Sequence, residues 1–540
     1  MSANTDISDS RSFSNNFTAV KDSSKTLQNT NSVFSDGENK SRSGSLNFSL
    51  NNYPMSNPIG RFALNGSVNI RNNESERNAR SIFDSYTNPA ADTGYNRLYN
   101  NNQESISLNL NLNYSGLRRL LFRRFNLFGV ELVFNQGLTY SNNKANALVS
   151  DYDSTGQKFQ RNNQLSNNNQ LQTLGYNPAL SFQKNFSKWS SRYSRNFNVS
   201  VRLVQRIKKE NNISSFAVRN VERSFSFFTP SFSLGHNYGL RDKFMSNVNL
   251  GFARDYTYPG IDQLYTITDS LNVYSVRFGN PGLKNTRIDN ANFNFSINKR
   301  KPKAKYEIGA SVSGSMNFKT NPIADSVIND ISGKRLMYYV NADDGVDYNL
   351  NYSANISRKI KKSSIQLQYS GNMGNSRNSN FIDGIESVNR NNNISHNINL
   401  QFSLRTLLIL KLSEVISTYS SNQSGSGLAS YKVNSASTQF GATLNVSKNF
   451  SFNTTVSTTD NSNVADKIIL WHAFSSYRFL KGKEGELKFS AFDLLKKFQN
   501  INVNTNIDGT STTVTNGLQQ YFLLTFSYYP RKFGKKGSDD

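Results

Sequence analysis

The chain has 540 residues, a formal net charge of +25 and a mean hydropathy of −0.59. It contains no cysteine, which excludes disulfide bonds and thiolate metal sites, and its aromatic content of 12% argues against disorder. No run approaches the roughly 18–20 apolar residues of a membrane helix, since the densest apolar patch covers only Leu407–Leu410.

Residues 1–42 form a polar N-terminal segment in which Phe13, Phe17 and Val20 could belong to one weak strand. The segment begins without the basic and apolar regions of a signal peptide.

From residue 43 to residue 529, apolar and polar residues alternate with the period of two that is typical of strands. The clearest runs contain Leu46, Phe48, Leu50; Ile106, Leu108, Leu110, Leu112; Phe197, Val199, Val201, Leu203; Val248, Leu250, Phe252; Phe293, Phe295, Ile297; and Ile394, Ile398, Leu400, Phe402. In all, the pattern predicts about 19–20 strands and no convincing helix. An all-β fold with this alternation can span a membrane at low mean hydropathy, as a barrel with lipid-facing and lumen-facing residues.

The last run is the most regular. Phe522, Leu524, Phe526 and Tyr528 alternate with smaller or polar residues, and only residues 530–540, a basic tail, follow. A terminal strand with one aromatic face is what a transmembrane barrel needs to close in lipid.

Short and long gaps between the predicted strands alternate. Arg358–Lys362 and Leu480–Gly485 are short, whereas Thr320–Gly345 and Gly374–Asn393 are long. Membrane barrels have short periplasmic turns and long extracellular loops. Counted back from the last strand, which then descends into the periplasm, the short gaps are periplasmic and at least one strand must precede residue 43. That strand lies within residues 1–42 or is lost from this chain. Because the first strand is the expected partner of the terminal strand and this chain is expected to lack it, we expect an open or irregular seam beside Gln519–Tyr529.

The positive charge gathers in clusters at the predicted periplasmic turns, among them Arg118, Arg119, Lys299–Lys305 and Arg358–Lys362. A basic rim near lipid headgroups accounts for this distribution. A nucleic-acid surface would require basic residues interleaved with exposed aromatics on one face, so we expect no nucleic-acid partner. A soluble basic β-protein that binds nucleic acid or polysaccharide is the weakest alternative.

Two segments resemble a known family. FGNPGLKNTRI (Phe278–Ile288) resembles the GNPxLKPE-type segment of TonB-dependent receptors, departing from it at Asn285 and Thr286. LWHAFSSYRFLKGKEGELKFSAFDLLKK and LQQYFLLTFSYYPRKFG are similar to the C-terminal end of the outer-membrane β-barrel family of Bacteroidota, with Gln520 where arginine is common.

The resemblance implies a barrel of about 22 strands in the cell outer membrane of a Gram-negative bacterium, of which this chain would hold most. Family members carry a signal peptide, a small β-domain and a plug domain before the barrel. None of these is recognisable here, and neither is a TonB box, so we expect the true start of the protein to lie upstream. The implied partners are outer-membrane lipid and lipopolysaccharide, the barrel-assembly machinery, and a TonB complex reached only through the plug. The resemblance also implies that the terminal strand, with Phe522, Leu524, Phe526 and Tyr528, carries the assembly signal.

The implied function is nutrient uptake by the barrel of a TonB-dependent receptor, with a plugless pore or a structural or adhesive surface barrel as the alternative. Five tyrosines in predicted extracellular loops are the ligand-binding candidates: Tyr256, Tyr258, Tyr265, Tyr338 and Tyr339. An aromatic girdle at the membrane interface is the alternative role for the first two. His236, His396 and His472 lie on different predicted strands, so no metal site, cofactor or enzyme activity is expected.

Overall fold

The structure is a computed structural model of the chain. It describes residues 2–21, 26–52, 61–86, 93–241, 243–268, 275–299, 305–329, 334–424, 430–462, 467–480, 482–497, 500–506, 509–515 and 520–529. The basic tail predicted at residues 530–540 and most of the Lys299–Lys305 cluster lie outside the described residues.

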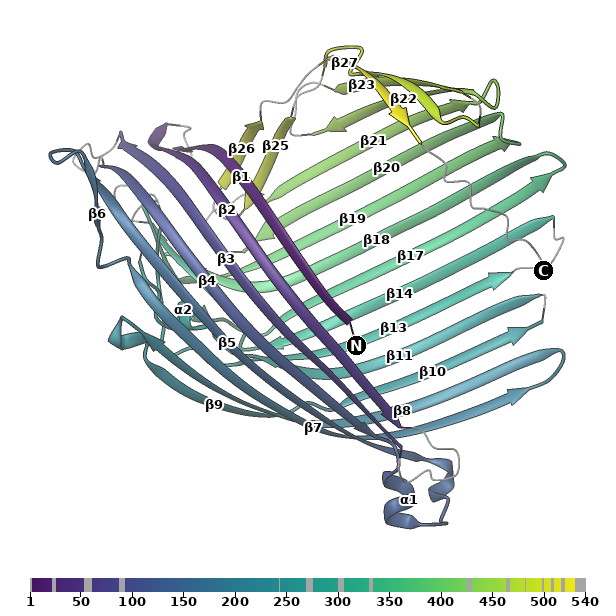
Figure 1. The fold of residues 1–540 in the computed structure, drawn as a ribbon, viewed down its shortest axis with the longest axis horizontal. Coiled ribbons are helices and arrows are strands. Elements are labelled where there is room, and N and C mark those ends of the chain that lie inside the picture. Colours follow the sequence, from purple (N-terminus) through teal and green to yellow (C-terminus); the bar gives the residue numbers. More distant parts are fainter. Residues whose placement is uncertain are drawn as a thin grey trace, which may run out of the picture.

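The fold is all-β, and 25 strands form one sheet that curves into a barrel wall (Figure 1). The long strands are β1 (Ser2–Lys21), β2 (Leu27–Asn52), β3 (Phe62–Ser85), β4 (Thr93–Tyr114), β5 (Glu131–Asp153), β7 (Asn167–Trp189), β8 (Tyr193–Ser214), β10 (Ser231–Leu240), β11 (Phe244–Thr257), β13 (Thr286–Lys299), β14 (Tyr306–Thr320), β17 (Gly345–Ile360), β18 (Ser363–Ile382), β19 (Ile385–Leu404), β20 (Leu408–Gln423), β21 (Tyr431–Leu444), β22 (Phe450–Asn461), β23 (Ile468–Phe479), β24 (Gly485–Phe492) and β27 (Tyr521–Tyr528). Each pairs antiparallel with the next long strand along the chain.

The remaining elements are short. They are β6 (Lys158–Arg161), β9 (Val221–Phe228), β12 (Ser275–Phe278), β15 (Ile323–Asn329) and β16 (Arg335–Asn341) in the large sheet, the separate hairpin of β25 (Asn500–Asn506) and β26 (Gly509–Thr515), helices α1 (Leu117–Phe122) and α2 (Ile261–Leu264), and 3₁₀ turns η3 (Leu127–Gly129) and η4 (Ala217–Arg219). The sequence pattern did not predict α1 or α2. No helix in the described part of the chain is long and apolar enough to cross a membrane.

The register of the wall places apolar residues together on one face. Phe293 pairs with Leu250, and Leu400 pairs with Leu412, and each of these side chains is about two-fifths exposed. The opposite face carries amides and hydroxyls that bond across and along the strands, for example from Asn290 to Asn317 over 2.7 Å. This polar face is the concave, inner one, because residues of β3 and β11, which are distant in the sheet, line a common cavity on it.

The wall begins closer to the N-terminus than the sequence pattern indicates. Whereas the first regular alternation starts at residue 43, β2 begins at Leu27 and β1 covers Ser2–Lys21. The polar halves of these strands pair along their whole length, from Ser2 with Asn47 to Lys21 with Leu27. Backbone hydrogen bonds, together with side-chain bonds such as the ion pair of Arg11 and Asp36, hold these polar segments in strand form, so they need no alternation of hydrophobicity.

The sheet has two free edges. Within the described residues β1 pairs only with β2, and β27 pairs only with β24. Among the described residues the seam between β1 and β27 is therefore unpaired, as expected beside Gln519–Tyr529. β1 lies before residue 43, where the strand parity predicts at least one strand. β27 and β1 run in opposite directions along the wall, as neighbours in an antiparallel barrel must.

The two rims of the wall differ, and we name them the short-turn rim and the loop rim. Residues 190–192, 361–362 and 405–407 are connections at the short-turn rim, where α1 also lies (Figure 1). The loop rim carries α2, β12, β15, β16 and the β25–β26 hairpin. The predicted long connection Gly374–Asn393 is wrong, because β18 and β19 continue to a two-residue turn at Asp383 and Gly384, both with positive φ.

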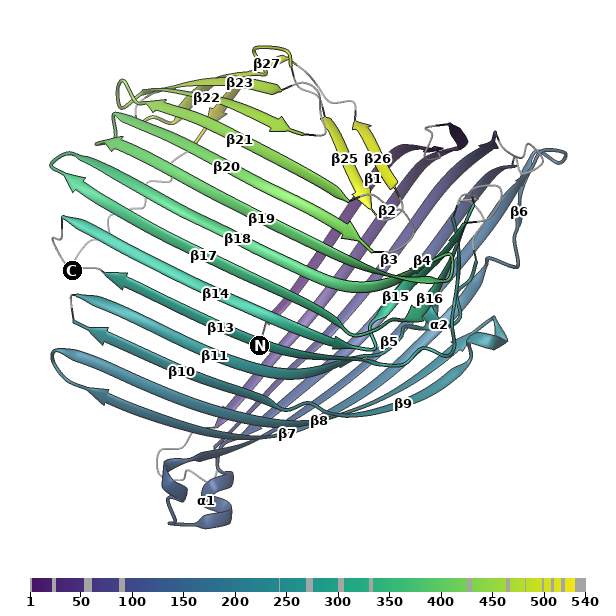
Figure 2. The ribbon, with the colours of Figure 1, turned by 180° about the vertical axis from the view of Figure 1, so that it is seen from behind.

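Two loops of the loop rim cross the mouth of the barrel. The loop after β11 contributes β12, which pairs in parallel with β16 from the loop after β14, and β15 pairs in parallel with the end of β18. Ile267 of the first loop packs against the buried cluster of Ala79, Tyr99, Val149 and Leu165. Figure 2 shows α2, β15 and β16 gathered beside β5. The mouth is thus spanned from β18 to the wall of β3–β5.

Candidate functional site

Tyr256 and Tyr258, two of the predicted ligand-binding tyrosines, lie at the loop-rim end of β11. Tyr256 stacks on Phe227 of β9, with ring centroids 4.5 Å apart and an interplanar angle of 9°. Tyr258 stacks on Phe225, with centroids 4.7 Å apart. We name these four rings the aromatic platform. Tyr256, Tyr258 and Phe227 line a cavity of about 700 Å³ on the inner face.

A buried carboxylate supports the platform. Glu210 of β8 is 4% exposed and forms ion pairs of 2.5 Å with Lys208 and with Arg223. The ammonium of Lys208 lies 3.7 Å from the ring centroid of Tyr258 and bonds to its hydroxyl. Because one carboxylate neutralises only one of its two cations, positive charge remains beside the platform.

Two arginines of β8 extend this charge along the inner face. Arg206 pairs with Asp255 of β11. Arg202 is exposed, lines the cavity, and has no hydrogen bond or ion pair to any residue that the structure describes. An exposed guanidinium without a partner is available to an incoming anion.

The floor of the cavity is made of uncharged polar side chains from β3, β4, β5 and β7. Its members are Asn65, Asn111, Asn113, Asn135, Thr139, Thr173 and Asn177. Gly137 and Gly175 lie among them, and because they have no side chains they leave space above this part of the floor. A Cβ atom at Gly175 would stand 2.4 Å from the Thr139 hydroxyl, whereas one at Gly137 would have no contact shorter than 3.4 Å.

The other predicted tyrosines lie elsewhere at the mouth. Tyr338 of β16 stacks on Phe278 of β12, with centroids 5.0 Å apart. Arg277 lies 4.8 Å over the ring of Tyr339 and bonds to Asp325 over 2.7 Å. Burial acts to lower the pKa of Arg277, but bonds to Tyr339 and Asp325 outweigh it and raise that pKa, so the guanidinium stays charged.

Tyr265 joins neither group. It ends α2, where its backbone N–H donates to the carbonyl of Ile261 over 2.8 Å. The structure therefore brings together Tyr256 with Tyr258, and Tyr338 with Tyr339, as two separate sites.

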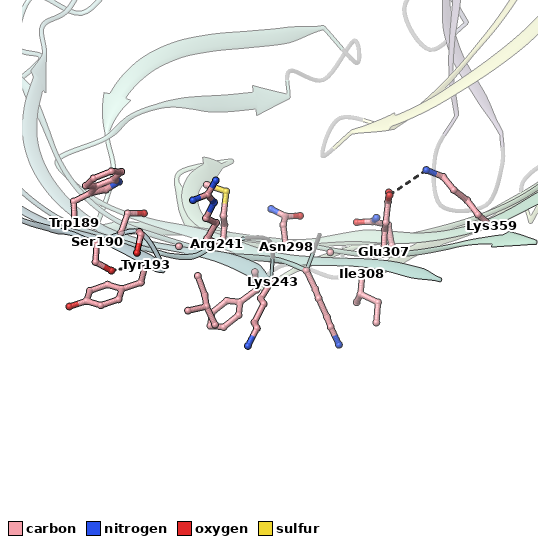
Figure 3. A pocket seen from close by; sticks show the side chains of 18 residues that line it. Trp189, Ser190, Tyr193, Arg241, Lys243, Asn298, Glu307, Ile308 and Lys359 are labelled. Carbon is pink, nitrogen blue, oxygen red and sulfur yellow. Dashed lines mark hydrogen bonds and ion pairs between the residues drawn. The ribbon is translucent and has the colours of Figure 1, made fainter. Parts of the chain in front are cut away.

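A second hollow, of about 1300 Å³, lies at the short-turn rim. Figure 3 shows Trp189, Asn298 and Glu307 on one side of the wall and Lys243 and Ile308 on the other. On the first side, Glu307 pairs with a lysine of β17, Lys359, at 3.6 Å. The alternation between the two faces thus continues to this rim.

The three histidines do not converge. The ring nitrogen Nε2 of His236 accepts from Arg195, the ring of His396 lies 2.9 Å from the hydroxyl of Tyr352, and His472 accepts from the backbone of Asp493. In the described part of the chain, no group of three or more histidine, aspartate and glutamate side chains could hold a metal ion.

The terminal strand presents its predicted apolar face outward. Phe522, Leu524, Phe526 and Tyr528 are all more than half exposed. Their neighbours on β24 are Ala491, Phe489, Leu487 and Gly485. The row is continuous with the apolar outer face of the wall.

Several residues of the cavity were not predicted. Arg202, Lys208 and Glu210 occupy the polar positions of an alternating run, and Phe225 and Phe227 belong to a strand that Pro230 separates from β10. Arg202 could have been predicted from the sequence, because it is a charged residue at a lumen-facing position inside a regular alternating run. The convergence of β8, β9 and β11 has no local signal.

These features define a class: an all-β chain whose large antiparallel sheet forms a barrel wall with an apolar outer face and a polar inner face. No family model matches the sequence, and no curated protein does. Among solved structures, the chain is similar to the copper transporter OprC, with 9% identity, a TM-score of 0.40, and coverage of 97% of this chain and 81% of that one. It is similar to the ferric citrate transporter FecA in the unliganded form, with 8% identity, a TM-score of 0.40, and coverage of 97% and 78%. It is also similar to the hemophore receptor HasR of Serratia marcescens, with 11% identity, a TM-score of 0.39, and coverage of 97% and 80%.

Proposed function

We propose that this chain is the barrel of an outer-membrane transporter that takes up a nutrient, with energy supplied by a TonB complex. The observation that carries the proposal is the division of the wall into an apolar outer face and an amide-rich inner face over its long strands. That division suits a wall with lipid outside and water inside. The TonB partner is implied by the sequence resemblance alone.

The loop rim supports a role in ligand capture. It places Arg277 and the stacked pair of Phe278 and Tyr338 at the mouth, with the aromatic platform on the inner wall. In this proposal the loop rim faces outward, the short-turn rim faces the periplasm, and the terminal strand β27 serves assembly into the membrane.

A passive pore is the second candidate, and the hydrophilic inner face favours it, since water and small solutes could cross such a lumen. The two functions differ in conductance across a planar lipid bilayer. The complete natural gene product is expected to stay closed without an energy source if it is a TonB-driven transporter. A stable open channel would contradict that proposal and support the pore.

A further inference from the structure

We propose that the cavity beside the aromatic platform binds a polyhydroxylated carboxylate, such as an acidic saccharide or a small hydroxycarboxylate. The inference rests on the proposed function, because a solute must be able to enter the lumen. The cavity of about 700 Å³ lies in the range of small-molecule sites.

The excess positive charge around the cavity favours an anionic ligand. Four cations, Arg202, Arg206, Lys208 and Arg223, face two carboxylates, Asp255 and Glu210. Two positive charges are therefore left without a counter-charge. Arg202 is the accessible one, and a guanidinium recognises a carboxylate through two parallel hydrogen bonds.

The polar floor on the opposite side of the cavity favours a ligand that carries hydroxyl groups. Asparagine and threonine side chains offer both donors and acceptors, as the hydroxyl of a polyol does. Asn135 shows such pairing with a hydroxyl within the protein, donating to Ser181 over 3.3 Å. A ligand with several hydroxyls can bond to this floor while its carboxylate reaches Arg202.

The shape of the floor leaves room for that ligand. Gly137 faces Asn177 across the β5–β7 pair, and Gly175 faces Thr139. Larger residues at these two positions would fill the space between the polar floor and the platform. The aromatic rings close the other side and give the ligand an apolar surface to lie against.

Calorimetry on the full chain folded in detergent tests the proposal with three probes: trigalacturonic acid, gluconate and neutral maltotriose. We expect saturable binding of at least one of the two carboxylates and none of maltotriose. Binding of trigalacturonic acid alone assigns an acidic saccharide, and binding of gluconate alone assigns a small polyhydroxylated carboxylate. No binding of either carboxylate, or equal binding of maltotriose, would overturn the proposal.

Two variants and one control locate the site. Arg202→Gln is expected to weaken binding about tenfold or more. A hydrogen bond to a charged group contributes enough binding free energy to change the affinity by at least that factor. Gly137→Tyr should abolish binding by filling the cavity. Arg192→Gln removes the same charge from the exposed short turn between β7 and β8 and should leave binding unchanged. Unchanged affinity in Arg202→Gln, or an equal loss in Arg192→Gln, would refute the site. Circular dichroism checks that each variant is folded. Binding is measured in detergent without a bilayer, so a loss of binding can be distinguished from a loss of transport.

Discussion

At the scale of residues, Glu210 is the clearest case of a side chain whose surroundings fix its role. It is 4% exposed, and its two oxygens each hold a different cation, Lys208 and Arg223. A buried carboxylate in this position is stabilised by its partners, and both partners depend on it in turn. Lys208 in turn contacts the ring of Tyr258, so the geometry of the aromatic platform depends on Glu210, which does not line the cavity.

Replacing Glu210 by Gln removes the charge and leaves both cations facing each other. We expect the free energy of unfolding to fall by about 3 kcal/mol, at the lower end of the range for a broken buried ion pair, because the two cations keep some exposure. Urea unfolding in detergent measures the change. Glu222→Gln, at an exposed position of β9, is the control and should change stability little. Equal stability of both variants would show that Glu210 is not the support described.

At the scale of elements, the hairpin of β18 and β19 shows how backbone conformation sets the length of a loop. The strands pair without a break from Ser363 with Leu404 to Ile382 with Ile385. The turn needs positive φ at both Asp383 and Gly384, at 49° and 79°. Aspartate followed by glycine suits a turn of this kind, because both residues tolerate the left-handed region.

Gly384→Ala should therefore destabilise the hairpin by about 1–2 kcal/mol, the cost of placing a Cβ atom in the left-handed region. Gly374→Ala in β18 is the matched control, because a Cβ atom there meets nothing within 4 Å and its backbone has no positive φ. Hydrogen exchange of the β18–β19 backbone reports the difference. A loss of protection in Gly374→Ala equal to that in Gly384→Ala would contradict the role of the turn.

The sequence predicts the strand segments with an apolar outer face far better than the segments without one. Leu400, Phe293 and Phe526 lie on that outer face and their chain neighbours lie on the polar inner face, so these segments show a clear alternation in sequence. The strand halves around Asn378 and Asn39 carry polar residues on both faces, so no alternation of hydrophobicity marks them as strands. The site follows the same rule: Tyr256 and Tyr258 were found as loop aromatics, but their partners Phe225 and Phe227 come together only through the curvature of the wall.

At the scale of the whole molecule, amides and hydroxyls line much of the inner face of the wall. Asn249 donates to Asn247 over 2.6 Å and Asn399 donates to Asn397 over 2.9 Å, so amides satisfy one another along a strand. Such a surface is wetted without attracting counter-ions. The local excess of positive charge around Arg202 differs from this uncharged polar lining, and the proposed anion site rests on that difference.

The central claim is that one face of the wall meets lipid and the other meets water. The chain contains no cysteine, so single cysteines report without background. Asn399→Cys and Leu400→Cys are adjacent positions on β19 that face inward and outward. In lipid vesicles, Asn399→Cys should react with a water-soluble maleimide. Leu400→Cys, labelled with a fluorophore before insertion, should be quenched by brominated lipid. Equal reaction of both cysteines with the maleimide, together with no quenching at position 400, would contradict a membrane-spanning wall.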